Sequence, residues 1–427
     1  MKQLWLCLFL MISLHLAGQT PLALTGTVVD GSTGKPLPFA QLIVKGTTIG
    51  TSANNDGEFR LSIPGGYEND SLLFGYLGYS PAHVPIVSFV SGPLKVKMTS
   101  VGIGLPEVEV VGLTAPEVIR KAVENLAANY GRDSVLLTGY IRVQKIVGNK
   151  LAEYAEAIVQ DLKDGYYAYP GKELRKKYAR SNFPMLVKGR VKSDTILVNS
   201  MGDVGRQAFC LSCPFVLDIA EMYHNTALDE ADFDKYDYRM KEIPGPDGKK
   251  IYHITYDQKE KVKETLYRGE IFISAENFAI MKVVYKPSMK AFDAYEKTKY
   301  NRPFTLRGVP GWIMEMPMGE NVITYGERDG HWSLSAIRND YAMVYVNMQS
   351  GKKIRYQYKM DLVVTDCSRD AALLRSFKGD KTLGATQRWD QLAGPVDEGF
   401  WQQYNYLPVE ETLQKAVRDM RDQKSRR

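Results

Sequence analysis

The chain has 427 residues, of which 44% are hydrophobic and 24% charged, so it is long enough for two or three domains with their own cores. Its 55 cations and 49 anions give a net charge of only +6, and no basic stripe is interleaved with aromatic residues, which argues against a nucleic-acid partner. Basic clusters at residues 172–177 and 418–427 are expected to be solvated helix faces, with contact to anionic lipid as the alternative.

The first residues predict an export signal. Lys2 precedes an apolar run over residues 4–16, and small residues follow before Gln19. We therefore expect residues 1–19 to be a signal peptide. An uncleaved membrane anchor is the alternative, but the apolar run is short for a membrane span. No later segment reaches membrane-spanning length without charges.

Residues 22–99 predict a small β-sandwich. Short apolar alternations are separated every few positions by turn residues, among them Gly34-Lys35-Pro36, Gly46-Thr47 and Asp56-Gly57. Asp56-Gly57 lies between two apolar runs and is typical of a hairpin turn, because glycine tolerates positive φ. Short strands at this spacing are typical of an all-β sandwich.

This stretch resembles the carboxypeptidase regulatory-domain-like family, which has a transthyretin-like β-sandwich fold. The resemblance rests on GTVVDGSTGKPLPFAQLIVKGTTIGT, NNDGEFRLSIP and FGYLGY, where many turn glycines fall in register. Asn54 departs from the family, since many members carry an acidic residue there. The resemblance implies a non-catalytic accessory module, of the kind found at the front of envelope proteins of Gram-negative bacteria. It therefore implies an exported protein that is periplasmic or associated with the outer membrane.

Residues 100–134 predict a linker with a short strand over 107–111 and a helix over 114–130. Thr114 is suited to cap this helix, and Glu117 complements the helix dipole. The apolar side of the helix predicts that it packs on the second domain.

Residues 135–370 predict a large antiparallel sheet. Four pairs of strand-like runs are each joined by a turn: 139–147 with 150–159, 236–243 with 250–257, 266–273 with 278–285, and 332–346 with 354–364. In the last run apolar residues alternate with polar ones, including Asp361, so we expect one face buried and the other solvated.

The segment GEIFISAENFAIMKVVY and its neighbours resemble the curved sheet of lipoprotein-carrier-like envelope domains. The whole chain is therefore expected to be mainly β (α+β). It should combine an N-terminal transthyretin-like β-sandwich with a curved open antiparallel sheet or half-barrel and a few helices.

The tail, residues 371–427, predicts a helix over about 409–422. Four aromatic residues precede this helix: Phe400, Trp401, Tyr404 and Tyr406. Packing of these side chains on the sheet is the default expectation, and a docking patch for a partner is the alternative.

Three cysteines remain after signal removal: Cys210, Cys213 and Cys367. The C-x-x-C spacing suggests redox chemistry or half a zinc site, but a second ligand pair and a βαβ context are both missing. We expect a structural disulfide, either within the pair or from one of its members to Cys367.

The sequence has no recognisable catalytic machinery. Glu221 and His224 form one E-x-x-H pair, but a di-iron site needs a second copy and two more glutamates. A nucleophile elbow, a P-loop and a dinucleotide fingerprint are all missing, so we expect no catalytic residue, cofactor or metal.

The predicted function is non-catalytic binding or docking in the cell envelope. A lipid, an acyl chain or a partner protein would lie on the curved sheet. A structural protein without a small ligand is almost as well supported by the sequence. An envelope hydrolase or peptidase-associated protein is the remaining alternative, which only the family name suggests.

Overall fold

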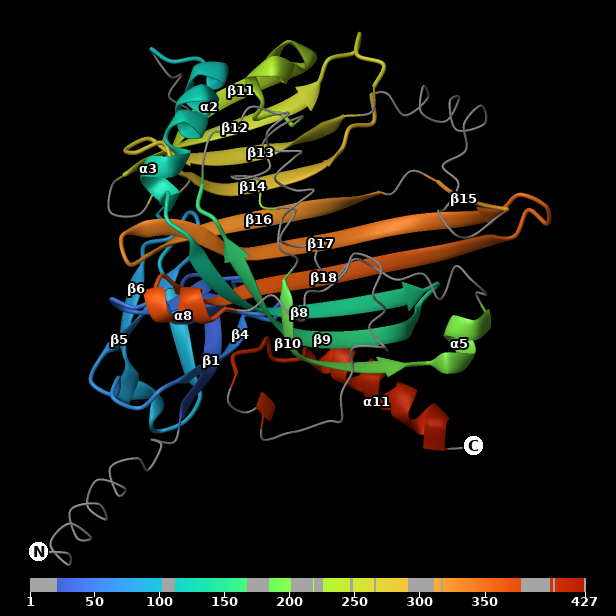
Figure 1. The fold of residues 1–427 in the computed structure, drawn as a ribbon, viewed down its shortest axis with the longest axis horizontal. Helices are drawn as coiled ribbons and strands as arrows, with labels where there is room; N and C mark the ends of the chain where they lie inside the picture. The colour runs from blue at the N-terminus through green and yellow to red at the C-terminus, as the bar shows by residue number, and fades with distance from the viewer. Residues whose placement is uncertain are drawn as a thin grey trace, which may run out of the picture.

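Two β-rich parts make up the structure (Figure 1). The computed structural model describes residues 21–101, 112–166, 184–200, 218, 226–245, 249–264, 266–290, 311–315, 318–377, 400–401 and 404–425. Most elements are strands, so the expected mainly β (α+β) class is confirmed. The predicted signal peptide at residues 1–19 and the predicted linker strand at 107–111 lie outside the described residues.

Seven short strands form the N-terminal β-sandwich. One sheet has the order β4-β1-β7 and the other has the order β3-β2-β5-β6. The elements are β1 (Leu22–Asp30), β2 (Gln41–Val44), β3 (Gly50–Ser52), β4 (Glu58–Ile63), β5 (Ser71–Gly75), β6 (Ala82–Pro85), the 3-10 helix η2 (Ile86–Phe89) and β7 (Leu94–Met98). Apolar side chains of both sheets, such as Leu42, Phe59 and Phe74, are buried in one core between them.

Glycine and aspartate determine the turns of the sandwich. Gly57 has a φ of +74°, and an added Cβ would lie 2.5 Å from the carbonyl oxygen of Val28, so only glycine fits here. The Asp30 carboxylate accepts hydrogen bonds from the Ser32 hydroxyl at 2.6 Å and the Thr33 backbone N–H at 2.6 Å. These bonds hold the pKa of Asp30 well below its usual range. Local sequence therefore fixes these turns.

The predicted linker helix is divided into α2 (Ala115–Glu124) and α3 (Leu126–Tyr130). Thr114 caps α2, and its backbone N–H donates to the Glu117 carboxylate at 2.6 Å, which completes a capping box. The break falls at Asn125, whose side-chain amide donates to the Lys121 carbonyl at 2.8 Å. This bond satisfies a carbonyl at the end of α2 and so competes with a continuous helix.

The large sheet is an open antiparallel sheet of 11 strands. Ten strands follow the order β10-β9-β8-β18-β17-β16-β14-β13-β12-β11, and β15 pairs with β17. The strands are β8 (Val135–Val147), β9 (Lys150–Lys163), β10 (Met185–Ser193), β11 (Tyr236–Pro244), β12 (Lys250–Gln258), β13 (Tyr267–Ser274), β14 (Ile280–Pro287), β15 (Trp312–Met314), β16 (Met318–Arg328), β17 (His331–Asn347) and β18 (Lys353–Ser368). The short helices α5 (Thr195–Ser200) and η3 (Glu230–Lys235) lie between strands in the sequence.

All four predicted hairpins are confirmed: β8 with β9, β11 with β12, β13 with β14, and β17 with β18. The sequence analysis missed β10, β15 and β16. In β16 the consecutive polar residues Glu320 and Asn321 interrupt the apolar alternation, because one lies on each face of the strand.

The two faces of the large sheet have different partners. The inner face carries Ile141, Ile337 and Leu362, and the outer face carries their neighbours Arg142 and Arg338. Helices α2 and α3 pack on the inner face, as predicted for the linker helix (Figure 1). The sandwich packs against the outer face.

Polar contacts tie the sandwich to the large sheet. Arg328 of β16 donates to the Thr48 carbonyl at 3.0 Å, and the Thr48 hydroxyl donates to Asp366 of β18 at 2.5 Å. The Gln41 side chain donates to the Tyr325 carbonyl at 3.4 Å. The sandwich is therefore packed on the sheet rather than tethered to it.

The tail returns to the outer face of the sheet. Its helices are α8 (Ala371–Ser376) and α11 (Glu411–Ser425), and α11 corresponds to the predicted helix over 409–422. Leu413 and Val417 of α11 pack against Leu151 and Tyr154 of β9. Among the described residues, no helix combines the length and the apolar character needed to cross a membrane.

Candidate functional site

A row of charged side chains crosses the centre of the outer face. Cross-strand pairing places the members of this row on β10, β9, β8, β18 and β17: Arg190, Glu156, Arg142, Asp361 and Arg338. The sign of the charge alternates from strand to strand, so each residue faces an opposite charge across the sheet. Burial of such a row costs free energy unless every charge is paired, which makes the row the first candidate for a functional role.

Arg142 is the centre of this row, and its side chain is 0% exposed. Its guanidinium donates to Asp361 at 2.9 and 3.1 Å and to Glu410 at 2.9 and 3.0 Å. Burial alone lowers the pKa of a guanidinium, but the two carboxylates outweigh it and raise the pKa of Arg142 well above its usual value. Asp361 is buried here, so the prediction of a solvated outer face is wrong at this residue. Arg142 requires the counter-charge because it is buried.

The sandwich reaches the same place through two asparagines. The Asn55 amide donates to Glu410 at 2.8 Å, and the Asn54 amide donates to the Pro408 carbonyl at 3.1 Å. An acidic side chain at position 54 lacks the amide hydrogens for this bond, so the departure from the family at Asn54 fits the contact. The sheet, the sandwich and the tail therefore meet in one network. We name it the outer junction, formed by Asn54, Asn55, Arg142, Asp361, Pro408 and Glu410.

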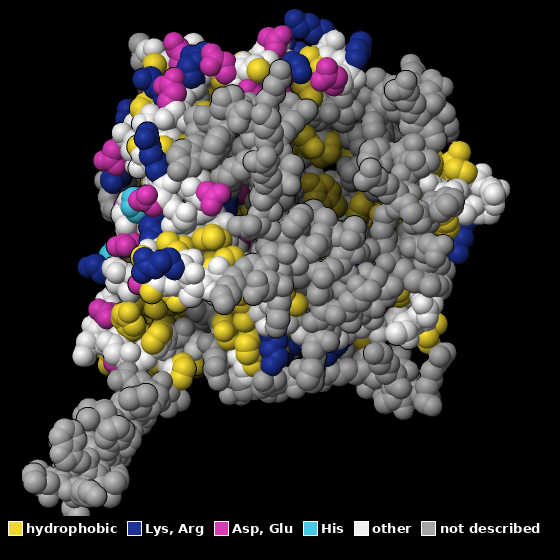
Figure 2. Space-filling model, in the orientation of Figure 1, with side chains coloured by type: hydrophobic (Ala, Val, Ile, Leu, Met, Phe, Trp, Pro, Cys, Tyr) yellow, Lys and Arg dark blue, Asp and Glu magenta, His cyan; other side chains and the backbone are white. Residues whose placement is uncertain are grey.

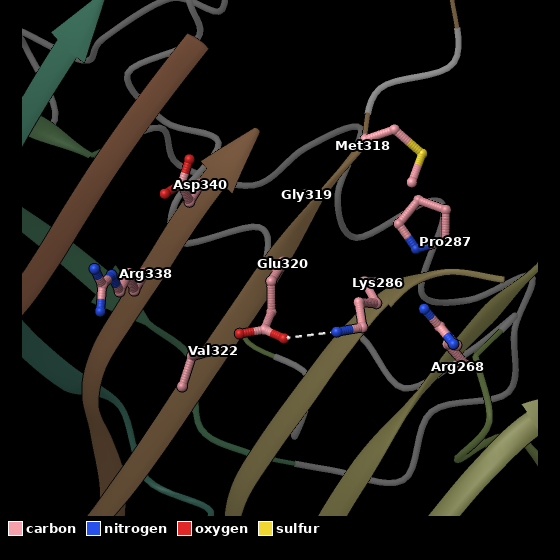
Figure 3. A pocket seen from close by; sticks show the side chains of 9 residues that line it. All are labelled: Arg268, Lys286, Pro287, Met318, Gly319, Glu320, Val322, Arg338 and Asp340. Carbon is pink, nitrogen blue, oxygen red and sulfur yellow. Dashed lines mark hydrogen bonds and ion pairs between the residues drawn. The ribbon is translucent and has the colours of Figure 1, made fainter. Parts of the chain in front are cut away.

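A hollow of about 420 Å³ lies beside the outer junction on the same face. Figure 3 shows Lys286 reaching toward Glu320, an ion pair of 3.3 Å. The hollow is lined by residues of β13, β14, β16 and β17: Arg268, Lys286, Pro287, Met318, Gly319, Glu320, Val322, Arg338 and Asp340. A hollow of this size with a mixture of charged and apolar walls suits a small polar ligand.

The inner face is apolar and rich in tyrosine. Figure 2 shows apolar side chains gathered near the middle of the molecule. Toward the far ends of β17 and β18 the inner face carries Met343, Tyr345, Ile354 and Tyr356, each at most 8% exposed. Burial raises the pKa of the Tyr345 phenol to about 12, so this tyrosine is neutral at physiological pH.

Buried ion pairs interrupt the apolar inner face. Lys145 of β8 lies 2.6 Å from Glu153 of β9, next to Tyr358, and a second pair is centred on Asp218. Asp218 is 0% exposed and pairs with Lys163. It also accepts hydrogen bonds from the Tyr166 hydroxyl at 2.8 Å and the Tyr325 hydroxyl at 2.7 Å. Both carboxylate oxygens have partners, so the arrangement is that of a satisfied structural ion pair rather than a free acid or base.

Of the three cysteines considered for the predicted disulfide, only Cys367 lies among the described residues. Cys367 is a buried free thiol, with its Sγ 3.6 Å from the Ser333 hydroxyl. The pairing of Cys367 with a member of the C-x-x-C motif is therefore not formed, because Cys367 is packed inside the large sheet. Cys210 and Cys213 lie outside the described residues, and a disulfide between them stays a prediction.

The predicted aromatic docking residues pack on the outer face of the sheet. Trp401 is 2% exposed, and the Arg190 guanidinium lies 4.3 Å from the centroid of its ring. Phe400, Tyr404 and Tyr406 are half-buried in the same cluster. The rings therefore pack on the sheet, as the default expectation had it, and a docking role for the half-buried rings stays a prediction.

Metal-binding and acid–base candidates are sparse. The described part of the chain holds no group of three or more His, Cys, Asp or Glu side chains suited to a metal ion. Glu221 and His224 lie outside it. His253 lies 2.8 Å from Glu270 and stacks on Phe272.

The sequence analysis missed the outer junction. Arg142 and Glu410 are 268 residues apart, and no local pattern links them. Two features of the sequence pointed to the outer junction. Arg142 is a charge inside a strand of apolar neighbours, and Asn54 departs from the family pattern.

Comparison with known proteins confirms the resemblance of the N-terminal module. Residues 24–110 match the family model described as the CarboxypepD_reg-like domain. Over 68 residues, 16% of this chain, the sequence is 37% identical to the TonB-dependent receptor SusC of Bacteroides thetaiotaomicron. Over 62 residues, 14% of this chain, it is 36% identical to the TonB-dependent receptor P3 of Formosa agariphila. Each match spans 6% of the receptor's length.

Solved structures similar to this chain include two proteins whose alignments cover more than half of it. A LolA superfamily protein, NE2245 from Nitrosomonas europaea, is 13% identical, with 62% of this chain and 99% of that one covered at a TM-score of 0.20. A DUF1329 family protein from Desulfovibrio piger is 11% identical, with 60% and 92% covered at a TM-score of 0.22. Scores at this level do not bear on function.

Proposed function

We propose that this chain is a non-catalytic binding protein of the cell envelope, whose inner face holds an apolar ligand such as an acyl chain. The observation that carries the proposal is the extent of the apolar inner face relative to its helices. Ten strands in one path give a face about 43 Å wide, since neighbouring strands lie about 4.8 Å apart. Helices α2 and α3, with 10 and 5 residues, are only about 15 and 8 Å long.

Beyond these helices, the apolar surface continues along the longest strands. Met343 and Tyr345 of β17 lie next to Tyr356 and Ile354 of β18 on the same face. Apolar area removed from water contributes about 25 cal/mol per Å². These side chains are at most 8% exposed, so an acyl chain would bind here, without any directional contact, by taking the place of the groups that now bury them.

The family match supports an envelope location for this chain. Its N-terminal module resembles a domain of two TonB-dependent receptors, and the sequence begins with the pattern of an export signal. In this proposal the sandwich is an accessory domain fixed on the outer face by the outer junction. The inner face is left for the ligand.

A scaffold without a ligand is the second candidate. The observation in its favour is the burial of the inner face, where Tyr345 and Tyr356 are each 3% exposed. In that case the apolar side chains are an ordinary core, and the envelope role is protein–protein contact alone.

Titration with a fluorescent fatty acid distinguishes the two candidates. The wild-type mature chain is expected to bind the probe saturably. Met343→Gln places an amide in the apolar surface and is expected to weaken binding about tenfold, equivalent to about 1.4 kcal/mol. Met348→Gln, an exposed methionine just after the same strand, is the matched control and should bind like wild type.

A thermal melt of each variant shows whether Met343→Gln still folds. If it does not, Tyr356→Phe and Tyr356→Ser provide a graded pair at the neighbouring position. Absence of saturable binding to the folded wild-type chain contradicts the ligand proposal and supports the scaffold. Equal binding by wild type and folded Met343→Gln contradicts the inner-face location.

A further inference from the structure

Two hollows on the outer face share part of their lining. The larger is the hollow of about 420 Å³ between β13 and β17. The smaller, of about 190 Å³, lies between the sandwich and the sheet, where Phe39 and Tyr76 face Lys282. Val322 and Arg338 line both hollows, so the two form one groove. We name it the outer groove.

The carboxylates along the outer groove already have cationic or amide partners. Glu320 pairs with Lys286 at 3.3 Å. Asp340 lies 3.4 Å from Lys359 and accepts a hydrogen bond from Gln357 at 2.8 Å. Asp361 is held by Arg142 of the outer junction. The negative charge of the groove is therefore largely neutralised by the protein itself.

Two cations of the groove lack such a partner. Among the described residues, the side chains of Arg268 and Lys282 have no hydrogen-bond or salt-bridge partner. The Lys282 ammonium lies 5.8 Å from the centroid of the Phe272 ring, and the charges of Glu270 and Glu320 act on it without an ion pair. Burial outweighs these two carboxylates and lowers the pKa of the Lys282 ammonium.

The positions of the two cations define an elongated site. Arg268 lies opposite Lys286 across β13 and β14, and Lys282 lies four residues earlier on β14. At about 3.3 Å per residue, the two positive positions are about 13 Å apart along the strand. This separation matches a molecule of about two sugar rings, and the larger hollow alone lies within the volume range of small-molecule sites.

We propose that the outer groove binds a sugar-sized anionic ligand whose phosphate or carboxylate groups pair with Arg268 and Lys282. A partly buried ammonium without a counter-ion costs free energy, and an oxyanion removes that cost. A guanidinium such as that of Arg268 suits both oxyanions, because its donors match their geometry. Val322 and the Phe39 ring provide an apolar wall for the ligand body. This site is independent of the inner face.

Calorimetric titration of the mature chain tests the proposal with three probes: glucose 1-phosphate, glucuronate and neutral glucose. At least one anionic sugar is expected to bind saturably with a dissociation constant in the micromolar to millimolar range, while glucose does not. A single oxyanion reaches only one of two cations that are about 13 Å apart. At least one of the variants Arg268→Gln and Lys282→Met is therefore expected to weaken that binding about tenfold, and unchanged binding by both would overturn the site. Binding of glucose 1-phosphate but not glucuronate identifies the oxyanion as a phosphate, and the reverse result identifies it as a carboxylate. Either result supports the groove.

Arg239→Gln is the matched control. Arg239 is exposed and belongs to the same cross-strand row as Arg338 on the outer face, but lies on β11, outside both hollows. Equal weakening by Arg239→Gln would indicate diffuse electrostatic attraction and overturn the site. Glucose binding as tightly as the anions, or no saturable binding by any probe, would overturn it as well.

Discussion

The two faces of the large sheet are formed by the same strands but differ in chemistry. On the outer face, the central strands present alternating charges that pair with one another and with the tail. On the inner face, the next residues of the same strands are apolar, as in Ile337 beside Arg338 and Leu362 beside Asp361. Directional bonds hold the sandwich and the tail in one position, whereas an apolar surface accepts any occupant of suitable shape.

Under the proposed function, this difference assigns stability to the outer junction and binding of the apolar ligand to the inner face. Loss of one partner in the outer junction leaves a buried charge, so the outer face tolerates little change. The inner face depends on area, so single substitutions there change affinity by smaller steps. The following predictions test this division, from the largest expected effect to the smallest.

Arg142→Met should cause the largest loss of stability. The substitution leaves Asp361 and Glu410 buried without their shared cation, and breaking such a network costs about 3–5 kcal/mol. Urea unfolding measures the change in the free energy of unfolding. Arg239→Met on the exposed part of the same face should be unchanged. A loss below about 1 kcal/mol for Arg142→Met would show that the junction is not a central element of the fold.

Trp401→Ala should destabilise the tail by removing a buried ring. Large aromatic truncations in packed sites cost about 3–5 kcal/mol, and Trp401 is buried in a cluster with Tyr140 and Ile158 of the sheet. Limited proteolysis should cut the tail of the variant faster than that of wild type. A stability and a cleavage rate equal to those of wild type would show that Trp401 does not hold the tail on the sheet.

Glu410→Gln should reduce the acid sensitivity of the fold. Burial raises the pKa of this carboxyl, but the charge of Arg142 and hydrogen bonds, including those from Asn55, outweigh burial and lower it on balance. The ionised form therefore stabilises the fold above the unfolded-state pKa of about 4.3, and this contribution is lost as the pH falls through the folded-state pKa.

The variant should lose about 1.5–3 kcal/mol at neutral pH and show a flatter decline in acid. Unfolding free energies of both proteins at several pH values between neutral and acid provide the check. Parallel curves for the two proteins would show that Glu410 is not the titrating group.

Glu320→Gln should have the smallest effect on stability. The Lys286 and Glu320 side chains are each 45% exposed, and exposed pairs contribute about 0–1 kcal/mol. The same change frees Lys286 and should therefore tighten the binding of an anionic sugar in the outer groove, as calorimetry would show. A weaker affinity of the variant for the anionic sugar would contradict the proposal that the groove attracts anions.

Local features of the fold were predictable from the sequence, because local physics determines them. The Asp56-Gly57 turn depends on the positive φ of Gly57. The cap of α2 depends only on Thr114 and Glu117, three residues apart. The β17–β18 hairpin pairs two runs that are neighbours in the sequence. The outer junction was not predictable, because it joins positions 54, 142, 361 and 410 through docking of separate parts of the chain. The alternation of β18 even predicted a solvated Asp361, and its burial follows from the packing of the tail and the sandwich on this part of the sheet.

The central claim is that the inner face holds an apolar ligand, and native mass spectrometry tests it most directly. The mature chain would be purified from its own envelope without delipidation and compared with Met343→Gln prepared in the same way. The account predicts a species heavier than the polypeptide by the mass of a lipid or an acyl chain, much reduced in the variant. A wild-type protein that carries only its polypeptide mass would contradict the account and support a scaffold.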